Sequence, residues 1–379
     1  MNILLYQRIV PHYRVPIFRK LFKKYGVIVC HSKEKFRSNL ASNYKMMDYP
    51  NFCMNRIYFP KKENLVIQNV LNPLLKKKPE IVISEFSLGY LSFWALFFLK
   101  SLFRYKFVAW THGFSNKEFI NPAFSIKTKI LLMCYKKLDG VILYSYFRKQ
   151  LVSKFLGDDA KLFVAQNTMD TSELIPLYHR FLKIGREKIR SQLQFKERYH
   201  LIFIGRLVKG KRIDLLLSVF EKLQSKFDIA LHVIGTGPEV EVIKEHCHKL
   251  PSLYYHGAIF DSKVTGKYLY ASDLFINPGH IGLSIVHAFC FATPVITCPA
   301  TPQGPFHGPE IEYLKHGKNG LLCDPSVESI STSIKKLLGD EAVHISMSKA
   351  AFETAVKDCS LEKMITGFHD AISYVSGNC

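Results

Sequence analysis

The sequence predicts an α/β protein with two doubly wound domains, each a parallel β-sheet with helices on both faces. One observation is that short apolar runs alternate with amphipathic helical segments along the whole chain. Another is the length of 379 residues, enough for about two to three domains. A third is the polar, charge-dense stretch 171–200, which separates two such series. We therefore expect a first domain over 1–170 and a second over 171–379. Residues 171–200 are expected to be a linker containing a helix, and the last helix can pack back on the first domain.

The apolar runs that we interpret as strands of the first half are Ile3–Tyr6, Val27–Cys30, Ile81–Ser84, Lys106–Trp110 and Val141–Tyr144. The helices expected around them are Val15–Lys24, Leu65–Lys77, Tyr90–Leu102 and Ser125–Lys137. The strands expected in the second half are Leu201–Gly205, Ala230–Ile234, Leu253–Tyr255, Leu274–Asn277 and Val295–Cys298. The helix after Arg212 has the clearest period, with an apolar face of Ile213, Leu216, Leu217, Phe220 and Leu223. Ligands of such sheets bind beyond the carboxyl ends of the strands, so functional residues are expected there.

The positive charge of the chain is concentrated in its first half. The formal net charge is +21. Residues 1–180 hold 29 Lys and Arg against 11 Asp and Glu, whereas residues 181–379 hold 23 against 20. This asymmetry indicates a polyanionic partner for the first half. The run Lys76–Lys78 beside the aromatic-rich segment Phe86–Trp94 favours an anionic membrane surface over nucleic acid. A solvated, lysine-rich face is the plainer alternative.

The cysteines and the apolar stretches argue against several other classes of protein. None of the nine cysteines forms a C-x-x-C pair, which favours free thiols in a reducing compartment. The segment His246-Cys247-His248 would point its side chains in different directions on a helix, so no metal site is expected there. The longest apolar stretch, Phe86–Leu99, has 14 residues, fewer than the roughly 20 that a membrane span needs, and we interpret it as a core helix. We recognise no signal peptide at the start of the sequence.

The loop after the strand Leu201–Gly205 carries two cations at the start of a helix. Arg206 and Lys211 follow Gly205. A guanidinium binds a phosphate with two donors and a helix start favours anions, so this loop predicts a phosphate or diphosphate site. Further motifs follow in order: Gly235-Thr236-Gly237, Tyr270–Gly279, His280–Phe289, Thr293–Thr297, Gly308-Pro309-Glu310 and Gly317–Gly320.

This ordered set resembles the retaining glycosyltransferases of family 4, whose GT-B fold has two Rossmann-like domains facing a cleft. The resemblance covers most of the chain and is strongest from about residue 200 to 325. In the first half, Pro11–Phe18 looks like the opening loop of a bacterial branch of the family. Trp110–Gly113 is similar to its strand-end histidine segment, and Asn167–Asp170 to its interdomain turn.

The resemblance implies a transferase that moves a sugar from a UDP- or GDP-type donor to an acceptor hydroxyl, with retention at the anomeric carbon. It implies that Arg206 and Lys211 hold the donor diphosphate and stabilise the leaving group, and that His112 contacts the donor from the first domain. These three are the expected catalytic residues. The expected donor-binding residues are Gly205, Arg206, Lys211, Thr236, Gly237, Gly279, His280, Gly282, Leu283, Ser284, His287 and Glu310. The expected acceptor-side residues are Tyr13, Arg14 and Glu85. No metal and no other cofactor are expected.

The chain departs from the family at its Glu-x7-Glu signature. Gly279 and His287 stand at the two glutamate positions, so both carboxylates are missing. His287 can still hydrogen-bond a ribose hydroxyl. Gly279 cannot replace a sugar-binding carboxylate, and neighbouring His280 is the candidate substitute. The glycine-rich loop that follows the first strand elsewhere in the family is also missing, and Arg14 is the candidate for part of its role. We infer that donor recognition is altered.

These observations favour a peripheral enzyme at the cytoplasmic face of a bacterial membrane. The expected acceptor is a saccharide or lipid-linked saccharide of lipopolysaccharide or capsule assembly. Three alternatives stay open: a catalytically degenerate protein that binds a sugar nucleotide or glycan, a nucleic-acid-binding protein, and a GT-B sugar epimerase. The plainer interpretations of single residues are a solvated loop for Arg206 and Lys211, a core histidine for His287 and a helix-start carboxylate for Glu85.

Overall fold

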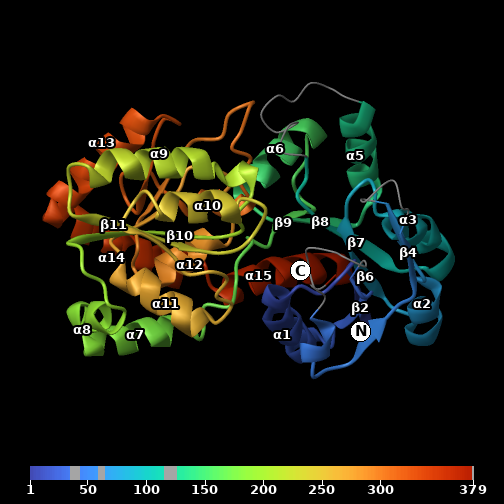
Figure 1. The fold of residues 1–379 in the computed structure, drawn as a ribbon. Helices are drawn as coiled ribbons and strands as arrows, with labels where there is room; N and C mark the ends of the chain where they lie inside the picture. The colour runs from blue at the N-terminus through green and yellow to red at the C-terminus, as the bar shows by residue number, and fades with distance from the viewer. Residues whose placement is uncertain (35–42, 59–64, 115–125, 378–379) are drawn as a thin grey trace. The chain divides into compact units, whose positions relative to one another are not determined.

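The computed structural model describes residues 1–34, 43–58, 65–114 and 126–377. These residues form two compact units (Figure 1). Unit 1 contains the described residues of 1–170 together with 361–377, and unit 2 contains 171–360. The end of the chain therefore belongs to the same unit as its beginning.

Unit 1 is built on a seven-stranded parallel sheet with the order β3-β2-β1-β6-β7-β8-β9. Its strands are β1 (Ile3–Tyr6), β2 (Ile28–His31), β3 (Asn51–Cys53), β6 (Ile81–Phe86), β7 (Lys106–Thr111), β8 (Gly140–Leu143) and β9 (Leu162–Val164). A separate antiparallel pair joins β4 (Arg56–Tyr58) to β5 (Val66–Gln68). Since β1, β6, β7 and β8 are neighbours, the loops that follow them meet at one edge of the sheet.

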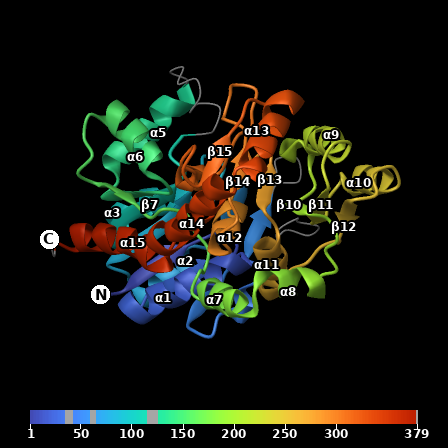
Figure 2. The same cartoon turned by 90° about the vertical axis from the view of Figure 1, so that its left-hand side faces the viewer.

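Helices cover both faces of this sheet. They are α1 (Val15–Tyr25), α2 (Leu71–Lys77), α3 (Leu91–Phe103), α5 (Ile126–Lys137), α6 (Tyr146–Leu156) and α15 (Leu361–Ser376), with 3-10 turns η1 (His12–Arg14) and η2 (Tyr44–Met46). The core on one face contains residues of α1 and α15, and the core on the other contains residues of α2, α3, α5 and α6. Along β1, Ile3 and Leu5 face the first core, while Leu4 and Tyr6 face the second, which is the two-residue period of a strand. Figures 1 and 2 both show α15 beside α1.

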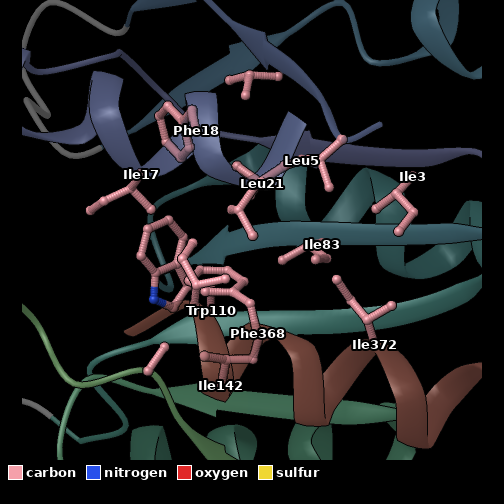
Figure 3. Packing of buried hydrophobic residues seen from close by; sticks show 14 of the residues in the cluster. Ile3, Leu5, Ile17, Phe18, Leu21, Ile83, Trp110, Ile142, Phe368 and Ile372 are labelled. Carbon is pink, nitrogen blue, oxygen red and sulfur yellow. The ribbon is translucent and has the colours of Figure 1, made fainter. Parts of the chain in front are cut away.

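Trp110 is at the centre of the core that α1 and α15 cover. Its side chain is fully buried, with ring centroids 4.9 Å from Phe368 of α15 and 6.4 Å from Phe18 of α1 (Figure 3). A buried aromatic side chain of this size contributes more to a core than any aliphatic one. The last helix is thus an integral part of unit 1.

Unit 2 is built on a six-stranded parallel sheet with the order β12-β11-β10-β13-β14-β15. Its strands are β10 (Tyr199–Ile204), β11 (Ile229–Ile234), β12 (Leu253–Tyr255), β13 (Leu274–Asn277), β14 (Val295–Thr297) and β15 (Gly320–Leu322). Its helices are α7 (Leu174–Ile184), α8 (Arg186–Gln192), α9 (Ile213–Gln224), α10 (Val240–Cys247), α11 (Ser262–Ala271), α12 (Ser284–Cys290), α13 (Val327–Gly339) and α14 (Glu341–Asp358). The 3-10 turns η3 (Lys209–Lys211) and η4 (Pro309–Tyr313) lie in loops after strands.

In unit 2 the apolar face predicted for α9 is confirmed, and side-chain caps begin several other helices. All five apolar residues expected on the inner face of α9 are buried. Side-chain caps begin several helices, because Asp261, Ser326 and Asp340 each accept a hydrogen bond from a backbone N–H in the first turn of α11, α13 or α14. These caps explain where α11, α13 and α14 begin, and the apolar face explains which side of α9 packs on the sheet.

The two parallel sheets confirm the predicted fold class, and two local expectations change. The helix expected over 65–77 begins only at Leu71, because Val66–Gln68 pairs with β4 as strand β5. The segment 171–200 contains α7 and α8 and the start of β10. The two helices pack on unit 2: Phe181 stacks on Phe291 with 5.9 Å between the ring centroids, and Arg190 binds Asp273 at 2.9 Å. The eight cysteines within the described part of the chain are free thiols. In that same part, every helix is too short or too polar to cross a membrane.

Candidate functional site

The two loops that carry most of the predicted donor residues meet at the carboxyl edge of the sheet in unit 2. Strands β10 and β13 are neighbours, so the loop after Ile204 lies beside the loop after Asn277. The backbone N–H of His280 donates to the carbonyl of Gly210 at 2.8 Å. The structure therefore brings the Arg206–Lys211 loop and the Gly279–Ser284 segment together.

Gly279 allows this close approach. A Cβ atom at Gly279 would lie 2.3 Å from the carbonyl oxygen of Gly210 and 2.4 Å from Cα of Lys211. Both distances are shorter than any real contact, so no side chain fits at this position with this backbone. A side chain at residue 279 would therefore require the backbone of Gly210 and Lys211 to move away.

Lys211 lies inside this pair of loops. Its ammonium donates to the carbonyl of His280. Burial lowers the pKa of Lys211 to about 8, although the nearby carboxylate of Glu310 acts in the opposite direction. Glu310 is buried, and a Cβ at Gly308 would lie only 2.1 Å from its Oε2 atom. The site therefore holds the half-buried ammonium of Lys211 near the buried side chain of Glu310.

Arg206 differs from Lys211 in its surroundings. Its side chain is exposed, and it forms no hydrogen bond or ion pair with any residue that the structure describes. An unpaired guanidinium can bind a diphosphate with two parallel donors without first breaking an ion pair.

A second loop at the same edge is held by Gly237. The carbonyl of Thr236 accepts a hydrogen bond from the N–H of Leu207 at 2.9 Å. A Cβ at Gly237 would lie 2.2 Å from the carbonyl oxygen of Leu207, and the φ angle of Gly237 is +155°. Thr236 and Gly237 thus fix the backbone beside Gly205 and Arg206.

His307 is a functional candidate that sequence reasoning missed. Its Nδ1 atom accepts the N–H of Ile281 at 3.1 Å, and its Nε2 atom donates to the carbonyl of Cys298 at 2.8 Å. These two bonds require the neutral tautomer with the proton on Nε2. Burial lowers the pKa of His307 to about 4, so the ring stays neutral at pH 7. The two contacts join positions 26 and 9 residues apart, and no local sequence pattern indicates them.

Asn277 also holds the loop that contains Gly279 and His280. Its Nδ2 donates to the carbonyl of His280 at 3.1 Å, and its Oδ1 accepts the N–H of Gly279 at 3.2 Å. The N–H groups that follow, at Gly282, Leu283 and Ser284, stand at the beginning of α12. Hydrogen bonds from Asn277, His307 and Lys211 therefore hold this loop in place.

His287 lies on α12, one turn beyond Ser284. Burial lowers its pKa to about 4, and its ring packs on Phe291 with 5.6 Å between the centroids. Its Nε2 atom is buried and has no hydrogen-bond partner among the described residues. The ring of His280 packs on Gly210, and it lies 5.7 Å from Phe306.

In unit 1, Arg14 is enclosed by aromatic rings. Its guanidinium lies 4.5 Å from the ring centroid of Trp110 and 5.1 Å from that of Tyr144. Its Nη2 atom donates to Oδ1 of Asn167 at 2.7 Å. Tyr13 lies next to it, at 5.4 Å from the guanidinium. Arg14 is buried, and these contacts already occupy much of its binding capacity.

His112 follows β7 at the carboxyl edge of the sheet in unit 1. Its ring is exposed and lies 4.3 Å, centroid to centroid, from Tyr144. Reduced solvation and then the positive charges of Arg148, Arg14 and Arg8 lower its pKa. Because His112 is exposed, loss of solvation alone does not account for its lowered pKa, and the positive charges of the three guanidinium groups contribute to it. His112 is neutral at pH 7 and can exchange a hydrogen bond with a ligand.

Arg148 holds the loop that presents His112. Its Nη1 atom donates to the carbonyl of His112 at 2.5 Å and to that of Phe114 at 3.0 Å. It belongs to α6, which begins with Ser145 as N-cap. The sequence shows Arg148 only as one more cation on a helix, so its positioning role was not predicted.

Glu85, at the end of β6, is bound to Arg8 after β1. Arg8 Nε donates to Oε1 of Glu85 at 2.7 Å, and the backbone N–H of Arg8 donates to Oε2 at 3.2 Å. Glu85 is not at a helix start, because α3 begins at Leu91. The structure therefore presents an ion pair at the carboxyl edge, where an acceptor-side residue or a helix-start carboxylate was expected.

Within the described ranges, no group of three or more His, Cys, Asp or Glu side chains could hold a metal ion. The site as described offers hydrogen-bond donors, cations and neutral imidazoles.

Comparisons with known proteins find matches among glycosyltransferases. Residues 185–354 match the family "Glycosyl transferases group 1". An uncharacterized glycosyltransferase of Methanocaldococcus jannaschii is 27% identical over 320 residues, which cover 78% of this chain and 76% of that protein. The GDP-mannose-dependent alpha-(1-6)-phosphatidylinositol monomannoside mannosyltransferase of Mycobacterium tuberculosis is 24% identical over 224 residues, and the match spans about half of each protein, 55% and 54%.

A solved structure shows the same fold. The crystal structure of HepE from Anabaena in complex with UDP has a TM-score of 0.72 with 16% identity, covering 98% of this chain and 100% of that one. This likeness confirms the GT-B fold. The chain is thus a protein of the GT-B fold whose residues 185–354 match the family "Glycosyl transferases group 1".

Proposed function

We propose that this protein is a retaining glycosyltransferase that transfers a sugar from a nucleotide-sugar donor to a saccharide or lipid-linked saccharide acceptor. The observation that carries the proposal is the pair of loops in unit 2, in which Lys211 and the unpaired Arg206 lie at the carboxyl edge of a parallel sheet. Such an edge is where open α/β sheets bind nucleotides. The match of residues 185–354 to the family "Glycosyl transferases group 1" supports the same conclusion.

In the proposed reaction, the positive charges of the site stabilise the departing nucleoside diphosphate. The bond between the anomeric carbon and the diphosphate oxygen breaks, and a bond to the acceptor oxygen forms on the same face of the sugar. The acceptor proton passes to the departing diphosphate. Arg206 and Lys211 would stabilise the negative charge that develops there, because fixed cations in a partly dehydrated site cost little reorganisation. The N–H groups of Gly282, Leu283 and Ser284 would approach the donor from the other side.

The histidines of the donor loops would replace the two missing carboxylates. Nε2 of His287 would hydrogen-bond the ribose, since it is buried without a protein partner. The steric limit at Gly279 means that any contact to the sugar in this region must come from His280 or from backbone groups. A donor sugar that lacks or modifies the hydroxyl bound by the usual glutamate suits this site best.

The donor would be of the UDP or GDP type. The Anabaena protein with the same fold was solved with UDP, and the mycobacterial relative is GDP-mannose-dependent. In unit 1, His112 would contact the donor sugar or phosphate, while Tyr13, Arg14 and the Arg8–Glu85 pair would form the acceptor side. Arg14 and Glu85 would act mainly through their neighbours, because both are engaged by protein groups.

The acceptor would be a lipid-linked saccharide of bacterial surface-polysaccharide assembly, with unit 1 at the inner face of the cytoplasmic membrane. Residues 1–180 carry a net charge of +18, which would attract anionic lipid. Association of this kind weakens at high salt, since added ions screen surface charges.

A nucleotide-release assay tests the proposed reaction. Purified protein is incubated with UDP- and GDP-sugars, with and without saccharide acceptors, and free nucleotide is measured. We expect release from one donor, stimulated by acceptor, and its loss in Arg206→Ala/Lys211→Ala. A matched control, Lys249→Ala/Lys263→Ala, removes two exposed cations of unit 2 away from these loops and should keep full activity. Product of inverted anomeric configuration would contradict retention.

The missing carboxylates favour one further candidate, a degenerate protein that binds a sugar nucleotide or a glycan without transfer. Gly279 cannot carry a side chain at the position where the family has its sugar-binding glutamate. Tight donor binding without nucleotide release on any acceptor would favour this second candidate.

A further inference from the structure

Unit 1 exposes apolar side chains on the outer sides of two neighbouring helices. On α3, Phe98 is 73% exposed and Leu102 is 74% exposed. On α5, Ile126, Ile130 and Met133 are exposed and fall at intervals of four and three residues, which places them along one side of the helix. We call these five residues the outer helical face. The segment 86–99, expected to be a core helix, thus buries Phe93 and Leu96 but presents Phe98 to solvent.

The two helices lie on the same face of the sheet. Residues of both contribute to one core, and α3 joins β6 to β7 while α5 leads into β8, the next strand. Lys100 of α3 donates to the carbonyl of Lys137 at 3.4 Å, so the C-terminal ends of the helices meet. Figure 1 shows α3 and α5 on the same side of this sheet. The exposed apolar residues therefore lie on two helices that cover the same face of the sheet.

Basic residues follow the ends of these helices along one edge of the sheet. The loops at this edge are joined by backbone hydrogen bonds: Lys106 to Glu80 at 2.9 Å, Asp139 to Phe107 at 3.0 Å and Val141 to Lys161 at 2.8 Å. We call the cations on them the basic rim, which consists of Lys76, Lys77, Lys78, Lys100, Arg104, Lys106, Lys136, Lys137 and Lys161.

Most of the basic rim is unpaired. Asp139 binds Lys100 at 2.7 Å and Lys106 at 3.7 Å. Six further cations of the rim form no ion pair with any described residue; they are Lys76, Lys77, Lys78, Arg104, Lys136 and Lys137. The exposed face of α5 adds Lys127 and Lys129 beside Ile126 and Ile130, and α5 has no acidic residue. Apolar side chains and excess positive charge thus occur together on one side of unit 1.

We propose that the outer helical face and the basic rim together form a docking surface for an anionic lipid bilayer. The lysines would contact anionic headgroups, and Phe98, Leu102, Ile126, Ile130 and Met133 would enter the boundary between headgroups and acyl chains. Nucleic acid would engage the same lysines but would leave the apolar residues in water, so a bilayer matches the combined surface better. This inference rests on the proposed membrane association and gives it a specific surface.

The basic rim lies at the opposite edge of the sheet from the candidate site of unit 1. The rim stands at the amino ends of β6, β7 and β8, whereas Glu85 and His112 follow the carboxyl ends of β6 and β7. A bilayer bound to the rim leaves these residues uncovered. Changes to the rim should therefore affect membrane binding without affecting donor chemistry.

Vesicle flotation of the full chain tests the proposal. The probes are phosphatidylcholine vesicles with and without phosphatidylglycerol, at low and high salt, in the absence of donor and acceptor. We expect binding only to the anionic vesicles. The variant Lys76→Gln/Lys77→Gln/Lys136→Gln/Lys137→Gln should bind about tenfold more weakly or worse. Phe98→Ser/Leu102→Ser should also weaken binding, and this second loss should persist at low salt.

A matched control removes the same charge from unit 2. The variant Lys226→Gln/Lys249→Gln/Lys263→Gln/Lys318→Gln changes four exposed, unpaired lysines and should bind vesicles as the wild type does. Wild-type-like thermal unfolding of every variant establishes that each is folded. Equal losses in the rim and control variants, binding to neutral vesicles, or binding to DNA but not to vesicles would each overturn the proposal.

The nucleotide-release assay separates this proposal from the proposed function. Rim variants that fail to bind vesicles but release nucleotide normally support the docking surface and the transferase together. Vesicle binding without any transferase activity would leave the docking surface standing and overturn the proposed function.

Discussion

His307 accepts a hydrogen bond from the backbone N–H of Ile281, with 3.1 Å between Nδ1 and the nitrogen. The bond ties the loop after β14 to the loop after β13, and the other ring nitrogen anchors the histidine on Cys298. The backbone that would face the nucleotide sugar is therefore fixed by a residue that need not touch it.

Replacing His307 should weaken donor binding through this loop. His307→Leu leaves the N–H of Ile281 and the carbonyl of Cys298 without a partner, which costs roughly 1–3 kcal/mol for each buried group. We expect the Kd for the donor, measured by calorimetry, to rise about tenfold. His307→Asn, which keeps a donor and an acceptor, should restore part of the affinity. His248→Leu changes an exposed histidine and should have no effect. Unchanged donor affinity in folded His307→Leu would show that the loop does not depend on this ring.

Donor affinity should fall as the pH rises above about 8. The pKa of Lys211 is lowered to about 8 by burial, so its ammonium loses its proton within a measurable range. A diphosphate binds the protonated form, and affinity is therefore highest below this pKa and decreases above it. Titration of the donor between pH 6.5 and 9.5 measures the effect. Lys211→Arg keeps its charge throughout and should remove this pH dependence. A wild-type profile that is flat across pH 8 would argue against Lys211 as a diphosphate ligand.

Unit 2 should lose stability in mild acid because of a chain of three histidines. His200 Nδ1 lies 3.1 Å from His232 Nε2, and His232 Nδ1 lies 3.1 Å from His256 Nε2. Each contact needs one protonated and one bare nitrogen, so three neutral rings satisfy both contacts, and protonation of two of the rings would break at least one of them. Burial lowers the pKa of all three, that of His200 to about 4.

The sign of the effect follows from linkage. The unfolded state binds protons near pH 6.5, and the folded state does so only at lower pH, so the unfolded state is favoured as the pH falls below about 6.5. We expect the Tm to be constant between pH 7 and 8 and to fall steadily from pH 6.5 to 5. His256→Phe should make this fall shallower. Equal Tm values at pH 7.5 and pH 5 would contradict this prediction, because protonation of the three histidines would then leave the stability of the folded state unchanged.

Arg14→Ala should destabilise unit 1 by roughly 2–4 kcal/mol. The substitution removes a charged hydrogen bond to Asn167 and the stacking of a guanidinium on Trp110. Arg14→Lys should recover only part of the loss, because an ammonium lacks the planar fork. Chemical unfolding followed by tryptophan fluorescence measures the change. Unaltered stability with a raised acceptor KM would instead assign Arg14 directly to the acceptor.

The sequence predicts the fold because its signals are local. Strands such as Ile3–Tyr6 and Leu253–Tyr255 are continuous apolar runs, and they occur in the structure with the same bounds. The strand β5 was not predicted, because Val66–Gln68 is defined by its pairing with β4 and not by its own composition. The rule that loops after parallel strands share an edge was enough to bring Lys211 and His280 together.

The missed residues depend on contacts between distant parts of the chain. Arg8 and Glu85 are 77 residues apart, and nothing in either segment indicates their ion pair. Arg148 reaches a carbonyl 36 residues away. The reason why residue 279 is a glycine is also long-range, since the obstacle is the backbone of Gly210 and Lys211. The pattern of side chains along the sequence does not show which distant backbone segments will be in contact in the fold.

The most direct test of the central claim is thermal unfolding of the purified protein against a panel of nucleotides and nucleotide sugars, without added metal. A ligand at about 100 times its Kd adds about 2.7 kcal/mol of stability. We predict that one UDP- or GDP-sugar raises the Tm of the wild type and of Lys249→Ala/Lys263→Ala but not that of Arg206→Ala/Lys211→Ala. A panel on which nothing stabilises the wild type, or a donor that stabilises the Arg206/Lys211 variant equally, would contradict the donor site.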